Sequence, residues 1–278
     1  MKGESGIKKF LKVVGILFAV VLVWFANAML GNPVSHMLAR KTAEAYLAEN
    51  FSHTDYYIQG IAYSFKDGNY YAHVRSDSSM DTQFTLYLTM TGKLRFDTYD
   101  SVTSGFVTAN RLDMEYGELA DSVLEDAAYP YNAYDSFAFG TLEIFDPEAL
   151  EDPNVTDIPP YAIDRSILVI DHVYDIRELG RQAGHIIIYV DSDTVTAERA
   201  AEIMLDIKAR FDAAGIPFKA MDLVLQYPRP DEGMRPEGDV RVRNFPYESI
   251  YEDDLIERIV TADAELTAYY AEMDAKYK

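Results

Sequence analysis

The stretch VVGILFAVVLVWFANAML, Val13–Leu30, decides where the rest of the chain is placed. It contains no charged residue, and as a helix it spans about 27 Å, against about 30 Å for the hydrocarbon core of a bilayer. A helix satisfies every backbone group internally, as lipid requires. The stretch therefore predicts a membrane-spanning helix, and the residues expected in the membrane include Val13, Ile16, Leu17, Phe18, Val21, Leu22, Trp24 and Phe25.

A cleaved signal peptide is the alternative interpretation of the same stretch. A basic start, an apolar run to Phe25 and the small-residue pattern Ala26-Asn27-Ala28 fit cleavage after Ala28. Both interpretations give one orientation, because positive flanks stay in the cytoplasm. The flanking charges are Lys2, Lys8, Lys9 and Lys12. We therefore expect a cell-membrane, single-pass protein with a cytoplasmic N-terminus, and residues 31 onward outside.

The exported part is acidic and has no cysteine. The net charge is −21 over 278 residues, and the first 30 residues hold four lysines and one glutamate, so the remainder carries −24. This argues against nucleic acid and anionic lipid surfaces as partners, which attract clustered Lys and Arg. The absence of cysteine excludes disulfides, thiolate metal sites and a lipidated cysteine anchor.

The first half predicts helices around an antiparallel sheet. Asn32-Pro33 is typical of a helix start, and Asp67-Gly68 and Thr91-Gly92 are typical of tight hairpins between strands of alternating polarity. The predicted elements are a helix to about Asn50, strands 56–65, 69–76, 82–90 and 93–100, a helix over 108–126 and a strand over 136–145.

The second half predicts a further sheet after the Pro-rich, acidic linker 146–161. The predicted elements are strands 167–175, 185–190, 218–227 and 239–247, a helix over 196–215, and a last helix after a Ser249/Glu252 capping box. The fold class is α+β: a transmembrane helix, then two α+β domains, each with a mainly antiparallel sheet packed by helices. The predicted divisions are 1–31 (cytoplasmic stub and transmembrane helix), 32–145 (first domain), 146–161 (linker) and 162–278 (second domain).

Three segments together resemble one family. These are GNPVSHMLARKTAEAYL after the apolar stretch, YSFKDGNYYAHVRSDSSMDTQFTL, and NFPYESIYEDDLIERI near the end. They are similar to the YfjL-like family of membrane-anchored, largely uncharacterised bacterial proteins, which has an N-terminal and a C-terminal domain. The resemblance implies an uncleaved anchor and two domains. It implies no catalytic residue.

The standard catalytic and cofactor motifs are missing from the sequence. We therefore predict no catalytic residue and no cofactor. Asp191, Asp193 and Glu202 have the outer spacing of a calcium loop, but Val195 and Thr196 replace its central ligand and glycine. The alternative is that Asp193 or Thr196 caps the next helix.

The best metal or acid–base cluster combines two histidines and two aspartates: His172, His185, Asp171 and Asp175. Imidazole and carboxylate groups would converge if the strands 167–175 and 185–190 paired. Two ordinary histidines at strand ends are the alternative.

Tyrosines of the first sheet raise a second hypothesis. Tyr56, Tyr57, Tyr63, Tyr70 and Tyr71 would line a groove for peptide or glycan, or else form cross-strand pairs. The leading functional hypothesis is a non-enzymatic, membrane-anchored protein that binds an envelope protein or peptide. The alternatives are an envelope hydrolase using paired carboxylates, and a peptide-binding or protease-inhibiting module with an open sheet edge.

Overall fold

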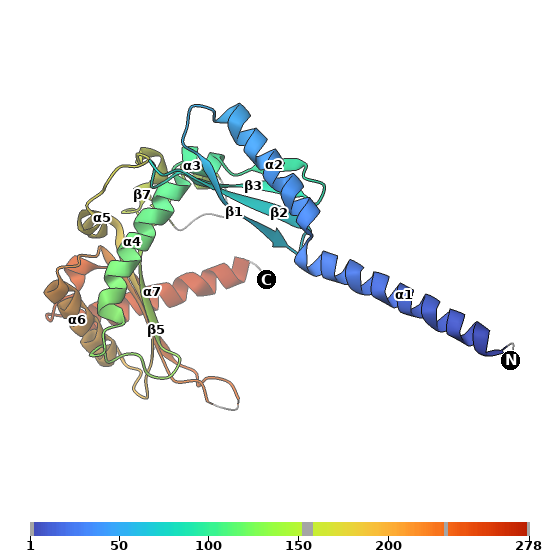
Figure 1. Cartoon of the computed structure of the whole chain (residues 1–278). Helices are drawn as coiled ribbons and strands as arrows, with labels where there is room; N and C mark the ends of the chain where they lie inside the picture. Colours follow the sequence, from blue (N-terminus) through green and yellow to red (C-terminus); the bar gives the residue numbers. More distant parts are fainter. Residues whose placement is uncertain (1–2, 152–157, 231–232, 277–278) are drawn as a thin grey trace. The chain divides into compact units, whose positions relative to one another are not determined.

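The computed structural model describes residues 3–151, 158–230 and 233–276 (Figure 1). The chain divides into two compact units, Met1–Val107 and Thr108–Lys278. Each unit has helices and a four-stranded sheet, and an apolar helix begins the chain. The predicted α+β class and the N-terminal apolar helix are confirmed.

The first unit is an antiparallel sheet with one face covered by a helix. Its elements are α1 (Gly3–Leu30), α2 (Pro33–Asn50), β1 (Tyr57–Ser64), β2 (Asn69–Arg75), β3 (Gln83–Thr89), β4 (Leu94–Asp97) and α3 (Asp100–Thr103), with strand order β1-β2-β3-β4. Helix α2 packs against the sheet through the buried residues Ala39, Ala43 and Leu47 (Figure 1). The predicted cap is present, since the Asn32 side chain accepts a hydrogen bond from the Ser35 N–H at 2.8 Å.

The second unit contains helices and a sheet with both parallel and antiparallel strands. Its elements are α4 (Phe106–Leu124, which begins two residues before the unit boundary), β5 (Phe137–Leu142), β6 (Ile144–Phe145), β7 (Ile163–Asp164), α5 (Ile176–Ala183), β8 (Gly184–Asp191), α6 (Ala197–Ala214), β9 (Ala220–Gln226), β10 (Asp239–Pro246) and α7 (Leu255–Lys276), with short 3-10 turns at Pro147–Glu151, Arg165–Ile167 and Tyr247–Ser249. The strand order is β10-β9-β8-β5. Strands β8 and β9 are parallel and joined through α6, and the outer pairings are antiparallel.

Two predictions of secondary structure need correction. The segment 167–175 forms no strand, because its apolar side chains Ile167, Val169 and Val173 are exposed. Its last residue, Asp175, instead caps helix α5, which was not predicted, and accepts hydrogen bonds from the N–H groups of Arg177 and Glu178. The last helix starts at Leu255, so the predicted capping box lies in the turn before it.

The division between the units also differs from the prediction. The boundary lies between Val107 and Thr108. The predicted helix 108–126 and the predicted strand 136–145 therefore both belong to the second unit, in which β5 pairs with β8. Of the predicted linker 146–161, residues 152–157 lie outside the described residues.

The two faces of β8 have different surroundings. Ile186, Ile188 and Val190 lie in one buried cluster with side chains of α6: Ile203, Met204, Ile207 and Phe211. The alternate residues His185, Ile187 and Tyr189 point to the other face, because side chains alternate along a strand. One face of the second sheet thus makes the core, and the other is left for different contacts.

Tyr116 of α4 packs against two glycines, Gly180 in α5 and Gly184 at the start of β8. It is fully buried, and its hydroxyl donates to the Pro217 carbonyl at 3.0 Å. A Cβ at Gly184 would lie 2.4 Å from the Tyr116 hydroxyl oxygen and 2.5 Å from the Gly180 carbonyl oxygen. Only glycine fits this approach of α4, α5 and β8.

Gly184→Ala is therefore expected to lower the free energy of unfolding of the second unit by about 1–3 kcal/mol, the usual cost of overpacking a core. Gly117→Ala in α4 is the matched control, because its Cβ would meet its nearest neighbour at 3.4 Å. Denaturant unfolding of the full-length protein, followed by circular dichroism, measures both. Equal effects of the two substitutions would contradict the close packing around Tyr116.

Candidate functional site

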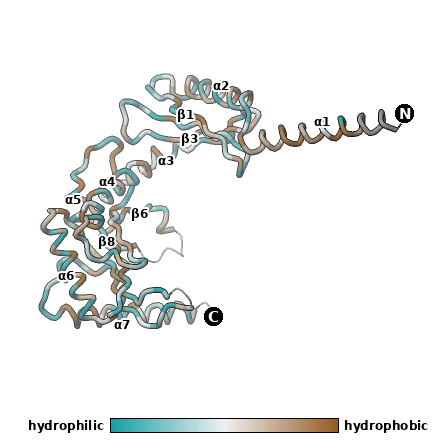
Figure 2. The backbone as a smooth tube through the Cα atoms, turned by 60° about the horizontal axis from the view of Figure 1, so that its bottom comes forward, coloured by the Kyte–Doolittle hydropathy of each residue, from teal (hydrophilic) through white to brown (hydrophobic). Residues whose placement is uncertain are grey.

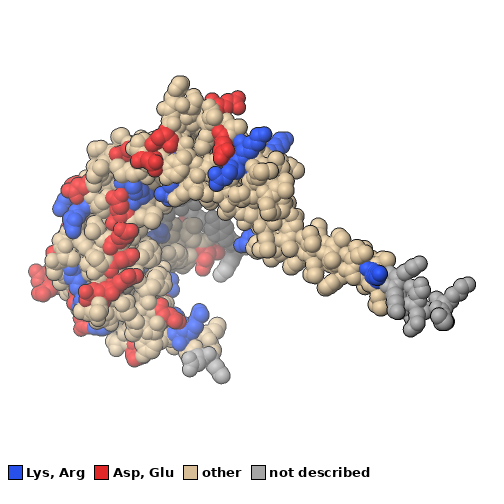
Figure 3. Space-filling model, in the orientation of Figure 1, with Lys and Arg blue, Asp and Glu red and all other residues tan. Residues whose placement is uncertain are grey.

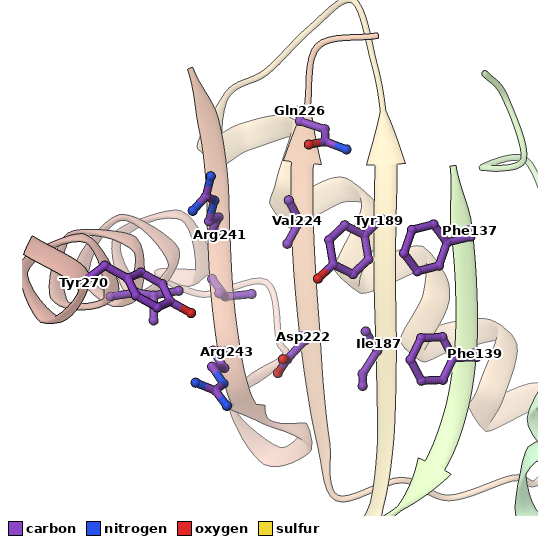
Figure 4. A pocket seen from close by; sticks show the side chains of 12 residues that line it. Phe137, Phe139, Ile187, Tyr189, Asp222, Val224, Gln226, Arg241, Arg243 and Tyr270 are labelled. Carbon is purple, nitrogen blue, oxygen red and sulfur yellow. The ribbon is translucent and has the colours of Figure 1, made fainter. Parts of the chain in front are cut away.

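The open face of the second sheet carries a hollow of about 700 Å³ (Figure 4). The apolar part of its lining comes from β5, β8, β9 and α7. We call this surface the aromatic face and define it by Phe137, Phe139, Ile187, Tyr189, Val224 and Tyr270. Polar side chains of Asp222, Gln226, Arg241 and Arg243 border it.

Three rings form a shelf on this face. Phe137 and Tyr189, paired across β5 and β8, have near-parallel rings with centroids 4.5 Å apart, and the rings of Phe137 and Phe139 differ by only 6°. Phe137 is 51% exposed and Phe139 is 41% exposed. Figure 4 shows the three rings face-on over the two strands. The shelf therefore offers flat ring surfaces to a ligand.

The polar border is held in place by hydrogen bonds. The Gln226 amide donates to Asp191 at 3.0 Å, and Arg241 forms an ion pair with Asp239. The Asp222 carboxylate accepts from the backbone N–H of Asn244 at 2.6 Å. These contacts orient planar amide, carboxylate and guanidinium groups around the shelf before any ligand binds.

His185 lies beneath one end of the aromatic face and joins two carboxylates. Its Nδ1 is 2.5 Å from Glu143 Oε1, and its Nε2 is 2.8 Å from Asp222 Oδ1. The histidine is 4% exposed, and the edge of the Tyr161 ring faces it. With both ring nitrogens protonated, each N–H donates to one carboxylate. The histidine thus ties β8 to β9 and to the segment after β5.

The two carboxylates change the protonation of this histidine. Burial by itself lowers the pKa of His185, but the hydrogen bonds and charges of Asp222 and Glu143 outweigh burial and raise the pKa to about 9. Burial and the same two carboxylates also raise the pKa of Tyr161 well above its usual range. The bridge is therefore an imidazolium between two carboxylates at neutral pH.

The N-terminal helix is a second candidate site. It contains an 18-residue window long and apolar enough to cross a membrane, the one such helix among the described residues, and none of that window is buried. Figure 2 colours much of this helix as hydrophobic. The predicted membrane residues are exposed, from 50% at Leu22 to 66% at Trp24.

Two family models together match most of the chain. The model of the YfjL-like N-terminal domain matches residues 7–98, and the model of the YfjL-like C-terminal domain matches residues 115–260. The chain belongs to the YfjL-like family. No curated protein matches it. A crystal structure of a DUF5037 family protein from Ruminococcus gnavus ATCC 29149 is similar at 15% identity, over 81% of this chain and 98% of that chain, with a TM-score of 0.25.

In this YfjL-like chain, the four residues of the predicted metal cluster serve separate contacts. His172 is exposed and meets the ring of Tyr174, Asp175 caps α5, and Asp171 lies in a turn with φ of 61°. His185 instead contacts Glu143 and Asp222. Among the residues that the structure describes, no group of three or more His, Asp or Glu side chains is placed to hold a metal ion.

Glu143 and Asp222 are partners of His185 that the sequence patterns do not predict. Strand alternation was the available signal, because it places Asp222 on the same face as Val224 and Gln226. The parallel register that brings β9 beside β8 was not predicted. The calcium-loop pattern has a structural explanation, since Thr196 caps α6 and Asp191 pairs with Arg235.

The predicted tyrosine groove is divided among separate contacts. Tyr56 packs with Phe51, Phe84 and Tyr99, and Tyr71 meets Tyr87 across β2 and β3. The Tyr63 hydroxyl donates to the Ala28 carbonyl in the last turn of α1, and the Tyr70 hydroxyl bonds Asn32 between α1 and α2. The cross-strand and core interpretation therefore describes Tyr63, Tyr70 and Tyr71. Tyr57 is 39% exposed and, with Tyr56, lines a separate hollow of about 420 Å³.

The His185 bridge makes stability depend on pH. Because its pKa is about 9 in the folded protein and 6.5 in a model peptide, the stabilisation is complete below pH 6.5 and is lost as the pH rises through 9. The expected loss is up to about 3 kcal/mol, at 1.36 kcal/mol per pKa unit. Denaturant unfolding of the full-length protein across this pH range measures it.

Two variants separate this bridge from other titrating groups. His185→Gln should remove the loss between pH 6.5 and 9, whereas His172→Gln, at an exposed histidine of the same unit, should retain it. The same pH dependence in wild type and His185→Gln would exclude the bridge as its cause.

Proposed function

We propose that this YfjL-like protein is a non-enzymatic, single-pass membrane protein whose second unit binds a glycan of the cell envelope through the aromatic face. In this proposal α1 crosses the membrane, the N-terminus is cytoplasmic and both units lie outside. The single observation that carries the binding role is the shelf made by exposed Phe137 and Phe139 and half-buried Tyr189, bordered by planar polar groups.

The exposed apolar surface of α1 supports the anchor. Side chains from Phe10 to Phe25 would face water along the whole helix if no lipid surrounded it. The contact at Ala28 supports an uncleaved chain, because the Tyr63 hydroxyl donates to the Ala28 carbonyl at 2.9 Å. Cleavage after Ala28 would remove that acceptor from the folded first unit.

The composition of the aromatic face supports a glycan as ligand. A sugar ring has flat C–H faces that pack on aromatic rings, and its hydroxyl groups bind carboxylate, amide and guanidinium groups. Asp222, Gln226 and Arg241 supply one of each around the shelf. The hollow is open along the sheet, which suits a chain of sugar units.

The sheet edges favour this ligand over an added peptide strand. Helix α4 lies against β5, since a Cβ at Gly140 would be 2.3 Å from Ala120 Cβ and Asp113 accepts from the Leu142 N–H. On β10, the backbone N–H of Arg241 donates to Asp263 of α7. Strand addition needs a free row of backbone groups, and helices meet both edges.

The arrangement of acids supports binding rather than hydrolysis. A carboxylate-dependent hydrolase needs one acid to protonate a leaving group and another to activate water or attack. Glu143 and Asp222 both accept from the buried His185. Their positions support a structural role beside the binding face.

Phe137→Ala is expected to weaken glycan binding by about fivefold to tenfold, since a sugar that covers this half-exposed ring gains roughly half of the about 1.5–3 kcal/mol that full burial of a Phe side chain contributes. The measurement is calorimetry on full-length protein in nanodiscs with soluble oligomers of N-acetylglucosamine, glucose and mannose. Phe96→Ala in the first unit is the control, because Phe96 is also 51% exposed and stacks on Tyr87. No heat with any oligomer, or equal losses in both variants, would refute the proposal.

The anchor is tested by chemical labelling of single cysteines in intact cells, since the native chain has none. Met80→Cys should react with a membrane-impermeant maleimide, and Ser5→Cys should react only after lysis. The intact mass should correspond to the full 31.5 kDa chain. Loss of residues 1–28 would establish the signal peptide instead.

A further inference from the structure

We infer that the end of the first unit next to α1 is a lipid-binding surface, whose exposed apolar side chains enter the interface of the outer leaflet while a rim of Lys and Arg binds anionic headgroups. This inference rests on the proposed membrane anchor. We call the surface the membrane-proximal end. It comprises the first turns of α2 (34–41), the β1–β2 turn (65–68) and the β3–β4 turn with the start of β4 (90–95).

A short, bonded junction joins this end to α1. Only Gly31 and Asn32 separate α1 from α2. The hydroxyl of buried Tyr70 accepts from the Asn32 N–H at 2.9 Å and lies 3.1 Å from the Asn32 carbonyl, and Tyr63 donates to Ala28. Gly31 has φ of +71°, and a Cβ there would lie 2.5 Å from the Tyr70 hydroxyl. The sheet is thus held directly against the end of the membrane helix.

Strand register places the two turns at the same end of the sheet. Ser64 pairs with Asn69, and Asn69 pairs with Thr89, so the turns that follow β1 and β3 are neighbours. The start of α2 lies there too, since a Cβ at Gly92 would lie 2.7 Å from Leu38 Cβ. The loop 76–82 is at the opposite end, because Arg75 pairs with Gln83.

The membrane-proximal end exposes large apolar side chains. Val34 is 61% exposed, Met37 62% and Phe65 56%. They continue the exposed apolar surface of α1, whose last residue, Leu30, is 78% exposed. Apolar side chains at the level of the headgroups leave water for the interface, as in amphipathic interfacial helices. Lipid is therefore the occupant that the anchor brings to this surface.

Several basic residues lie at the membrane-proximal end, where they can reach anionic lipid headgroups. Exposed basic residues surround the membrane-proximal end: Lys41, Lys66, Lys93 and Arg95. The β1–β2 turn also carries one acid, Asp67, which accepts hydrogen bonds from Asn69 and Tyr71. Acidic residues of the opposite end include Asp55, Asp77 and Asp81. Figure 3 shows Lys and Arg side chains on the part of the first unit near α1. Such basic residues near a bilayer attract anionic headgroups.

The test uses single-cysteine variants of the full-length protein in proteoliposomes, each labelled with an environment-sensitive fluorophore. Met37→Cys and Phe65→Cys probe the membrane-proximal end. Met80→Cys is the matched control, because Met80 is 48% exposed in the loop at the opposite end of the same sheet. In vesicles of phosphatidylcholine with phosphatidylglycerol, a shallow spin-labelled lipid should quench the first two labels at least about twofold more than the third.

Charge reversal tests the basic rim. Lys66→Glu with Lys93→Glu should reduce quenching at the Phe65→Cys label in vesicles that contain phosphatidylglycerol, and should change it little in pure phosphatidylcholine. Equal reductions in both vesicles, or none in either, would overturn the headgroup part of the inference.

Trp24, the single tryptophan, separates this inference from the anchor itself. If brominated lipid quenches Trp24 while the labels at 37 and 65 are quenched no more than the label at 80, the anchor stands and the inference fails. If Trp24 is not quenched, the proposed anchor fails and the inference fails with it. Quenching of Trp24 and of both membrane-proximal labels supports both.

Discussion

The packing of α6 onto one face of β8 and β9 determines which side chains of the second sheet point into the core and which point outward. Ile203, Ile207 and Phe211 of α6 are completely buried with Ile186 and Met221 of the strands. A side chain of this kind contributes about 1.5–3 kcal/mol when it leaves water, so these contacts fix which face points inward. Since strand side chains alternate, the same choice turns Ile187, Tyr189 and Val224 outward. The aromatic face is the consequence of a core made on the other side.

The buried histidine gives this arrangement a fixed register. His185 contacts Asp222 of β9 and Glu143 after β5, so one side chain joins three segments that are distant in sequence. A charged group at 4% exposure requires such partners, because an unpaired buried charge is costly. A one-residue slip of β9 would turn Asp222 into the core and leave His185 with one carboxylate. The bridge therefore specifies the pairing that also aligns the aromatic face.

Much of the fold was readable from local patterns. The hairpins at Asp67-Gly68 and Thr91-Gly92 and the Asn32 cap depend on nearby residues alone, and they formed as predicted. The segment 167–175 was mistaken for a strand because an apolar run does not say what it packs against, and its apolar side chains lie at the surface. The site was less predictable, since 42 residues separate His185 from Glu143 and 37 separate it from Asp222. Such contacts depend on strand order, which periodicity does not encode.

The net charge of a chain likewise does not predict which surfaces its charged residues occupy. Residues 31–278 carry −24, and on that total an anionic lipid surface is an unsuitable partner. However, charged groups at a protein surface act mainly within about 8 Å at physiological salt, so their positions matter more than their sum. Exposed Lys66 and Lys93 lie in the two turns next to α1, whereas exposed Asp55 and Asp77 lie at the opposite end of the sheet. An acidic protein is thus compatible with an anionic bilayer when its basic residues lie at the end attached to the membrane.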